Sequence, residues 1–443
     1  ASGEKPQSKL WYNDGRWWGD LVHSDGKHYI FYLDQATQTW VKTNTTLDTR
    51  TATKSDCLWD GTYLYVASGG GKASTGTDLD AVLYRYHYDS ASKTYVQDFG
   101  PVTIRTGGAE TLVLDKDSTG QLWITYTKSS TVYVNRSQGS DSSWVAADAF
   151  VMPTTGGTNP NVSSDDISTL ISFANTIVVV WSNQSTGAFY YSVHSDSNAD
   201  DKAWAGGVIA QSSGLADDHM NLKLQATDNR VFAVVKTTSN SGEIRLFSRS
   251  TSGSWSNTLV TAGSANQTRP IILVDSTNNR LYIFHSDEGG GVVYYKQSDA
   301  STINFGSTTS KGTAFISSAT YKEIDNSTST KQDVNNTTGI VILASDDTAK
   351  WYLHNYLSLG GSTPTPPTAN FSASPTSGSA PLAVQFSDTS TGSPTSWQWD
   401  FDNNGSTDST AQNPSFSYTT AGTYSVKLTV ANAGGSNATT KSG

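Results

Sequence analysis

The stretch Ser55–Ile104, SDCLWDGTYLYVASGGGKASTGTDLDAVLYRYHYDSASKTYVQDFGPVTI, decides the fold. It contains four short runs rich in β-branched and aromatic residues, at 55–60, 63–68, 81–88 and 95–104. Asp, Gly, Ser or Asn bounds each run, which is typical of half-buried antiparallel strands joined by turns. One such sheet cannot bury both of its faces alone, so the stretch predicts further copies of itself in the chain.

Related units recur up to residue 360. Their first runs begin near residues 9, 56, 110, 166, 219, 270 and 333, at the spacing expected for propeller blades. We therefore predict an all-β fold in which residues 1–360 form a seven-bladed β-propeller. The seventh unit, which opens at Lys331–Asp333, has no evident fourth strand. Either the residues before Lys9 or side-chain packing between the first and seventh units is expected to close the ring.

The composition restricts the classes of protein. The 443 residues include 13 Trp, 21 Tyr and 14 Phe, enough for an aromatic core, and the single cysteine, Cys57, excludes a disulfide framework. No run reaches the roughly 20 apolar residues of a membrane span. A formal charge of −10 without a Lys/Arg cluster argues against nucleic acid or an anionic membrane as partner. The Ser/Thr/Asn/Gly-rich chain, which starts without Met, indicates an extracellular or cell-surface protein.

A second domain is predicted after residues 361–367, a spacer rich in Gly, Ser, Thr and Pro. Residues 368–443 carry APLAVQF at Ala380–Phe386, WQWDF at Trp397–Phe401 and AGTY at Ala421–Tyr424. This segment resembles the polycystic-kidney-disease (PKD) domain, which implies an Ig-like β-sandwich. The resemblance also implies a final strand beyond Thr439–Lys441, so the domain is expected to lack its last strand, and the open edge to allow self-assembly.

The mouth of the propeller channel is the best candidate for a binding site. In a propeller the first strand of each blade lines the channel, and reading its start down the units gives a ring of polar residues: Lys9, Asp56, Glu110, Asp166, Asp218 with His219, Arg269 and Asp333. Ionisable groups around a narrow mouth must pair, bind water, or meet a cation or polar ligand. Polar side chains that only join neighbouring blades are the alternative.

Catalysis at this mouth would need carboxylates or a histidine. Asp56, Glu110 and Asp166 are candidates for the carboxylate pair of a polysaccharide hydrolase, and His219, beside Asp217 and Asp218, for a general base or metal ligand. If Asp218 and His219 lie on a strand, only one of them faces the channel. The propeller broadly resembles the sialidase-like, BNR-repeat class, although no intact Asp-box is present and no arginine triad can be mapped.

Aromatic and calcium sites are further candidates. Trp17 and Trp18 either stack on sugars at the rim or pack in the core. Asp400, Asp402, Asn404 and Asp408 have the spacing of the first part of a calcium loop, but position twelve holds Ala411, so either a weak Ca²⁺ site or an Asx-rich turn is expected.

We expect a binding or structural protein whose propeller recognises a glycan or another surface protein, with the PKD domain as spacer. No cofactor is required beyond the possible Ca²⁺. Two alternatives stay open: a polysaccharide hydrolase or lyase, and a subunit of a filament or surface lattice.

Overall fold

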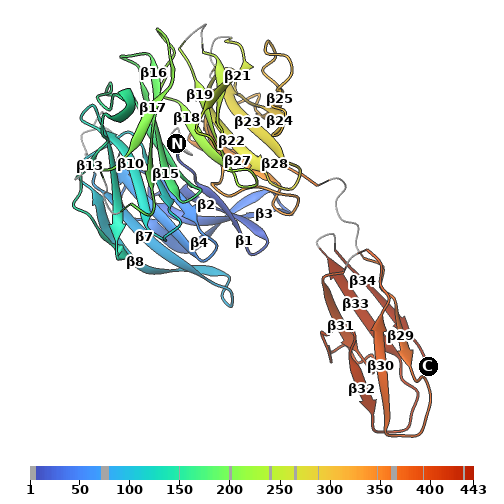
Figure 1. Cartoon of the computed structure of the whole chain (residues 1–443). Coiled ribbons are helices and arrows are strands. Elements are labelled where there is room, and N and C mark those ends of the chain that lie inside the picture. Colours follow the sequence, from blue (N-terminus) through green and yellow to red (C-terminus); the bar gives the residue numbers. More distant parts are fainter. Residues whose placement is uncertain are drawn as a thin grey trace. The chain divides into compact units, whose positions relative to one another are not determined.

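A computed structural model describes residues 6–70, 79–148, 150–198, 202–238, 242–263, 267–287, 289–346, 348–360, 367–392, 394–432 and 435–443. The chain divides into two compact units, Ala1–Leu359 and Gly360–Gly443 (Figure 1). The predicted spacer falls almost wholly outside the described residues. The helical structure among them is a three-residue turn, η1 (Thr155–Gly157), and no helix in the described part of the chain is long and apolar enough to cross a membrane.

The first unit is a β-propeller whose described residues form seven antiparallel sheets around one axis (Figure 1). Blade 1 contains β1 (Leu10–Asn13), β2 (Arg16–Val22), β3 (His28–Asp34) and β4 (Thr39–Asp48). Blade 2 contains β5 (Thr53–Trp59), β6 (Tyr63–Gly70), β7 (Ala81–Asp89) and β8 (Thr94–Arg105). Blade 3 contains β9 (Leu112–Lys116), β10 (Leu122–Lys128) and β11 (Thr131–Gln138), and both β12 (Ser140–Trp144) and β13 (Phe150–Val151) pair with β11.

The remaining blades repeat this pattern. Blade 4 contains β14 (Ser168–Phe173), β15 (Thr176–Asn183), β16 (Ala188–Ser195) and β17 (Ala205–Gln211). Blade 5 contains β18 (Met220–Gln225), β19 (Arg230–Lys236), β20 (Ile244–Arg249) and β21 (Trp255–Thr261). Blade 6 contains β22 (Gln267–Asp275), β23 (Arg280–Asp287), β24 (Val292–Asp299) and β25 (Thr313–Ser317). Blade 7 contains β26 (Ile324–Thr328), β27 (Ile340–Asp346) and β28 (Trp351–Leu357). The seven-bladed, all-β prediction is confirmed.

The hydrophobic core lies between blades rather than at the axis. Each blade presents apolar side chains on both faces, and buried clusters fill the interfaces between neighbours, for example the one in which Trp18 and Ile30 of blade 1 meet Val66 of blade 2. One cluster spans blades 6, 7 and 1 together. The first strands of successive blades contact one another around the axis. The sheets therefore bury their faces only as a closed ring, as the repeat predicts.

Blade 7 closes on blade 1 without a fourth strand. Leu10 forms a parallel bridge with Thr330, and the amides of Lys9 and Leu10 donate to the Ser329 carbonyl at 3.2 and 3.1 Å. Trp17 Nε1 donates to the Thr338 carbonyl at 2.8 Å, and Trp17 packs in the same buried cluster as strand β27. Both predicted means of closure contribute, because the residues before Lys9 also contact blade 7: the Gln7 carbonyl accepts from Thr328 Oγ1 at 3.0 Å.

The predicted start of the seventh unit is wrong. Its first strand is β26 (Ile324–Thr328), and Lys331–Asp333 follow that strand instead of opening it. The sequence of β26, IDNST, is polar although the strand is buried near the axis, so it lacks the hydrophobic pattern that marks the other strands.

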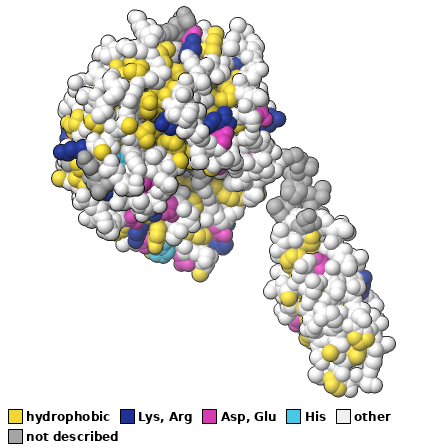
Figure 2. Space-filling view, in the orientation of Figure 1, with side chains coloured by type: hydrophobic (Ala, Val, Ile, Leu, Met, Phe, Trp, Pro, Cys, Tyr) yellow, Lys and Arg dark blue, Asp and Glu magenta, His cyan; other side chains and the backbone are white. Residues whose placement is uncertain are grey.

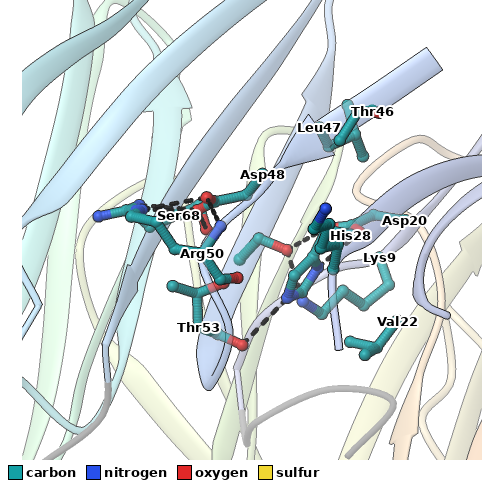
Figure 3. A network of polar contacts seen from close by, with 12 residues as sticks. Lys9, Asp20, Val22, His28, Thr46, Leu47, Asp48, Arg50, Thr53 and Ser68 are labelled. Carbon is teal, nitrogen blue, oxygen red and sulfur yellow. Dashed lines mark hydrogen bonds and ion pairs between the residues drawn. The ribbon is translucent and has the colours of Figure 1, made fainter. Parts of the chain in front are cut away.

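Buried charges join blades 1 and 2 (Figure 3). Asp20 of β2 accepts a hydrogen bond from Ser55 Oγ of β5 and lies 2.7 Å from His28 Nδ1. Lys9 Nζ donates to Ser55 Oγ at 2.5 Å and lies 3.8 Å from Asp20 Oδ2. Burial would raise the pKa of the Asp20 carboxyl, but His28 and Lys9 outweigh it and lower that pKa to about 2. The carboxylate thus stays charged inside the ring.

The second unit is a sandwich of two three-stranded sheets. One contains β29 (Phe371–Ser374), β30 (Leu382–Asp388) and β32 (Ser415–Tyr418), and the other contains β31 (Ser396–Asp400), β33 (Val426–Asn432) and β34 (Gly435–Lys441). Trp399, fully buried, packs on Phe371 and Phe386 between the sheets. Strand β34 pairs with β33 from Val426 to Asn432 at the edge of its sheet, and a further strand beyond Lys441 stays a prediction.

Asp56 is the residue whose replacement tests ring closure. Its two carboxylate oxygens accept the Ser8 amide at 2.7 Å and the Leu114 amide at 2.8 Å, and Lys331 Nζ lies 2.9 Å from Oδ2. We predict that Asp56→Asn lowers the free energy of unfolding by about 2–4 kcal/mol, because it leaves Lys331 and one buried amide without their acceptor. Chemical denaturation measures the change.

Asp60→Asn is the matched control. Asp60 forms another pair between blades 2 and 3, with Lys116 Nζ at 2.7 Å, but near the surface, so we expect a loss of about 1 kcal/mol or less. Equal losses in the two variants would show that Asp56 has no special part in holding the ring.

Candidate functional site

The two ends of the propeller channel are chemically different. All seven first strands run in the same direction along the axis, so their starts gather at one face of the ring and their ends at the other. We call these the start face and the end face. Residues 6–9 lie across the channel between them: the Pro6 carbonyl accepts from Asn221 of blade 5, Gln7 Nε2 donates to Leu112 of blade 3, and the Ser8 amide donates to Asp56 of blade 2.

The predicted mouth residues do not form one ring. Glu110, Asp218, His219 and Arg269 lie at the start face, where Arg269 pairs with Asp325. Lys9 and Asp56 are buried inside the ring. Asp166 is also buried and accepts the amides of Ser163 at 2.7 Å and Gln184 at 3.0 Å, within its own blade. Asp333 lies at the end face, because it follows β26. Asp56, Glu110 and Asp166 thus lie in different surroundings, and a catalytic carboxylate pair among them stays a prediction.

Acidic residues gather at the start face. Carboxylate oxygens of Glu110, Asp165 and Asp218 lie within 4.8 Å of one another, and Asp218 also belongs to a group with Asp217 and His219. Neighbouring carboxylates repel one another unless a proton or a positive group lies among them. Lys236 Nζ, 3.3 Å from Asp217 Oδ2, and the His219 ring supply positive groups here.

His219 lies in the loop before β18, not on the strand. The expectation that only one of Asp218 and His219 faces inward therefore fails, since strand alternation does not apply. Nδ1 of His219 lies 2.6 Å from Asp217 Oδ1 and 2.7 Å from Asp218 Oδ1. Its Nε2 is buried and has no hydrogen-bond partner among the described residues. Burial alone would lower the pKa of His219, but the two carboxylates raise it above its usual value.

The end face contains a cavity at the axis. Its volume is about 280 Å³, and blades 2, 3, 4, 5 and 7 contribute to its wall. The charged groups are Asp115, Lys223, Lys331 and Asp333, uncharged polar residues such as Asn221 and Gln332 add to the wall, and its apolar part includes Leu58, Trp59, Ile171 and Leu224. Pro6 and Ser8 of the axial segment line it as well. A small apolar cavity with a few converging polar groups is the usual form of a ligand site.

The charged groups of this cavity have shifted pKa values. Burial raises the pKa values of Asp115 and Asp333, although Lys331 near the first and Lys223 near the second oppose this. Burial lowers the pKa of the Lys223 amine to about 7, despite nearby Asp333. Several perturbed groups in one cavity are a mark of functional sites.

Sequence reasoning missed Lys223 and Asp115. In MNLKLQ (β18), the polar residues Asn221, Lys223 and Gln225 alternate with Leu222 and Leu224, so they share one face of the strand. That alternation was a usable signal, since the first strand of a blade lines the channel. Asp115 lies in a similar run, LVLDK of β9.

Trp17 and Trp18 are core residues, so the expectation that they bind sugars at the rim is wrong. Both side chains are fully buried. Trp18 makes edge contacts with Tyr32, Tyr88 and Tyr95 between blades 1 and 2. The ring nitrogen of each donates to a backbone carbonyl, which satisfies its polar group inside the protein.

The acidic loop of the second unit forms a hydrogen-bonded turn. Carboxylate oxygens of Asp400, Asp402 and Asp408 lie within 4.8 Å of one another. Asp400 accepts the amides of Asn404 at 3.0 Å and Gly405 at 2.8 Å, and Asp408 accepts that of Phe401 at 2.7 Å. These contacts account for the Asp and Asn residues as parts of a turn, so Ca²⁺ binding there stays a prediction.

Surface charge is mixed. On the face of the molecule shown in Figure 2, basic and acidic side chains lie next to one another rather than in separate areas. With a net charge of −10, such a surface offers no broad attraction for a polyanion.

Comparison with known proteins identifies the second unit. Residues 362–442 match the PKD domain family. No curated protein sequence matches the chain. Among solved structures, a protein of unknown function from Dyadobacter fermentans is 12% identical, with a TM-score of 0.44 over 66% of this chain and 89% of that one. An ulvan lyase of polysaccharide lyase family PL25 is 10% identical, with a TM-score of 0.49 over 81% and 94%. At these values the likenesses say nothing about which residues act.

The pH dependence of stability tests the charge at His219. The pKa of His219 in the folded protein lies above its value near 6.5 in the unfolded chain. The stabilisation that protonated His219 contributes is therefore complete below about pH 6.5 and is lost as the pH rises through the folded pKa. We predict that the denaturation midpoints of wild type and His219→Gln differ more at about pH 5.5 than at about pH 9, as measured by chemical denaturation.

His285→Gln is the control, because its effect on stability should depend on pH in the opposite direction. Burial lowers the pKa of His285 to about 4, so this histidine costs stability as the pH falls below about 6.5. The difference in stability between wild type and His285→Gln is expected to be smaller at about pH 5.5 than at about pH 9. If the difference in denaturation midpoint between wild type and His219→Gln is the same at both pH values, the raised pKa of His219 is contradicted.

Proposed function

We propose that this is an extracellular glycan-recognition protein that binds a neutral saccharide in the end-face cavity, with the PKD domain as an accessory module. The observation that carries the proposal is the cavity itself, in which lysine donors and carboxylate acceptors surround a space next to Trp59. Sugar hydroxyls both donate and accept hydrogen bonds, so they match such a mixed wall. PKD domains, in turn, are typical of extracellular proteins.

The charges favour a neutral ligand over an acidic one. Lys331 is already paired with Asp56, and Lys223 faces Asp333 and Asp115. A carboxylated or sulfated sugar would meet these aspartates without an unpaired cation of the cavity to receive it. At about 280 Å³ the cavity lies near the lower end of the usual range for ligand sites, so it suits a small saccharide or the terminal residue of a longer chain.

A glycoside hydrolase is the second candidate. Asp115 and Asp333 line the same cavity, and both have raised pKa values, which a general acid requires at neutral pH. Release of new reducing ends from a neutral polysaccharide, lost in Asp115→Asn and Asp333→Asn, would support this candidate over binding alone. The third expectation, a lattice subunit that assembles through the PKD domain, stays a prediction.

Binding measurements on variants test the proposed site. Using a panel of neutral oligosaccharides and calorimetry, we predict that Asp333→Asn weakens binding about 10-fold or more, because it removes a charged acceptor. Ala226→Trp, at an exposed position on the cavity wall, should fill the space and abolish binding.

Asp165→Asn, at the start face, is the matched control and should bind as wild type does. Loss of binding in Asp165→Asn with retention in Asp333→Asn would place the site at the other end of the channel. Failure of the whole panel to bind would refute glycan recognition.

A further inference from the structure

Lys223 is held in an unusual way for a lysine. Its side chain is buried, and Nζ donates to the carbonyls of Thr330 at 2.7 Å and Gln332 at 3.1 Å. Among the described residues these two carbonyls are its hydrogen-bond partners. A neutral amine has two N–H groups and one lone pair, whereas an ammonium has three N–H groups and no lone pair. The two carbonyls thus accept both N–H groups of a neutral amine and leave its lone pair unused, whereas one N–H group of an ammonium would have no acceptor.

The residue also lines the end-face cavity, where a ligand can approach it. The charged groups around it are Asp333 and Lys331 from the segment after β26 and Asp115 from β9. Asp333 and Asp115 favour the ammonium and Lys331 opposes it, but burial outweighs them and lowers the pKa of Lys223 to about 7. A much larger fraction of this amine is therefore neutral at pH 7 than the roughly one part in a thousand or less of an ordinary lysine.

We infer that Lys223 is a carbonyl-reactive amine that captures small aldehydes in the end-face cavity, including the open-chain aldehyde of a reducing sugar. The lone pair of Nζ attacks the aldehyde carbon, the two N–H protons of the neutral amine pass to the carbonyl oxygen, which leaves as water, and a C=N imine bond remains. The step is reversible and needs no oxidant or reductant. Desolvated lysines of lowered pKa are known to act in this way. The inference does not depend on glycan binding, since a small aldehyde alone is sufficient.

Lys296 supplies an internal comparison. Its Nζ donates to the carbonyls of Val260 and Ser307, both at 2.7 Å, and burial lowers its pKa too. It does not line the end-face cavity. The two lysines thus share the same two-carbonyl arrangement and differ in access to this space.

The test uses glycolaldehyde with cyanoborohydride, which reduces any imine to a stable secondary amine, and peptide mass spectrometry of the full-length protein. Lys93, whose side chain is 54% exposed, is the reference for a surface lysine. We expect Lys223 to be labelled at least about 10-fold faster than Lys93 at pH 7 and faster than Lys296. The ratio of Lys223 to Lys93 should fall above about pH 8, where surface amines begin to lose their protons.

Ala226→Trp, which fills the cavity mouth, should slow the labelling of Lys223 and leave that of Lys93 unchanged. Labelling of Lys223 no faster than that of Lys93 would overturn the inference. So would equal labelling of Lys223 and Lys296, because the cavity would then have no part in the reaction. Labelling of Lys223 in a protein that binds no saccharide would support the inference while refuting the proposed function.

Discussion

The carboxylate of Asp56 is the interaction on which the ring depends. It joins the axial segment through the Ser8 amide, blade 3 through the Leu114 amide and the end of blade 7's first strand through Lys331, while it belongs to blade 2 itself. A propeller buries the faces of its sheets only when the ring is closed, and here the seventh sheet has three strands among the described residues. Contacts near the axis therefore help to close the ring, as a fourth strand shared between the last and first blades does in other propellers.

The axial segment determines the chemistry of the channel. Its backbone groups lie in the interior and need partners, which Asn221, Asp56, Thr328 and Ser329 provide. By crossing the channel it separates two polar ends. A six-residue strand such as β18 spans about 20 Å, so His219 before it and Ala226 after it cannot share one mouth. The start face is acidic around His219, whose pKa the neighbouring carboxylates raise, and the end face combines lysines with aspartates.

This geometry explains which parts of the structure could be predicted. Seven units and their strands are visible because aromatic and β-branched runs recur between turn residues, a local pattern. Strand β26 was missed because IDNST, although buried near the axis, has little apolar character. That error assigned Asp333 to the wrong face, so one ring of eight residues was expected where four lie at the start face, one lies at the end face and three are buried inside. The sequence repeats also do not show how far along the channel axis each residue lies. Asp56 and Asp166, which are buried inside, were therefore grouped with residues at the mouth.

Lys223 and Lys296 show why the axis, rather than burial alone, generates a candidate site. Both amines lose hydration and gain two backbone acceptors, which offsets the cost of burying a neutral amine but not that of an ammonium. Between blades such a group is held by backbone carbonyls away from the cavity, as Lys296 is by Val260 and Ser307. At the axis the seven sheets cannot interdigitate, because each contributes only its narrow first strand. The space left there gives Lys223 the same desolvation together with room for a ligand, and that combination is what reactivity requires.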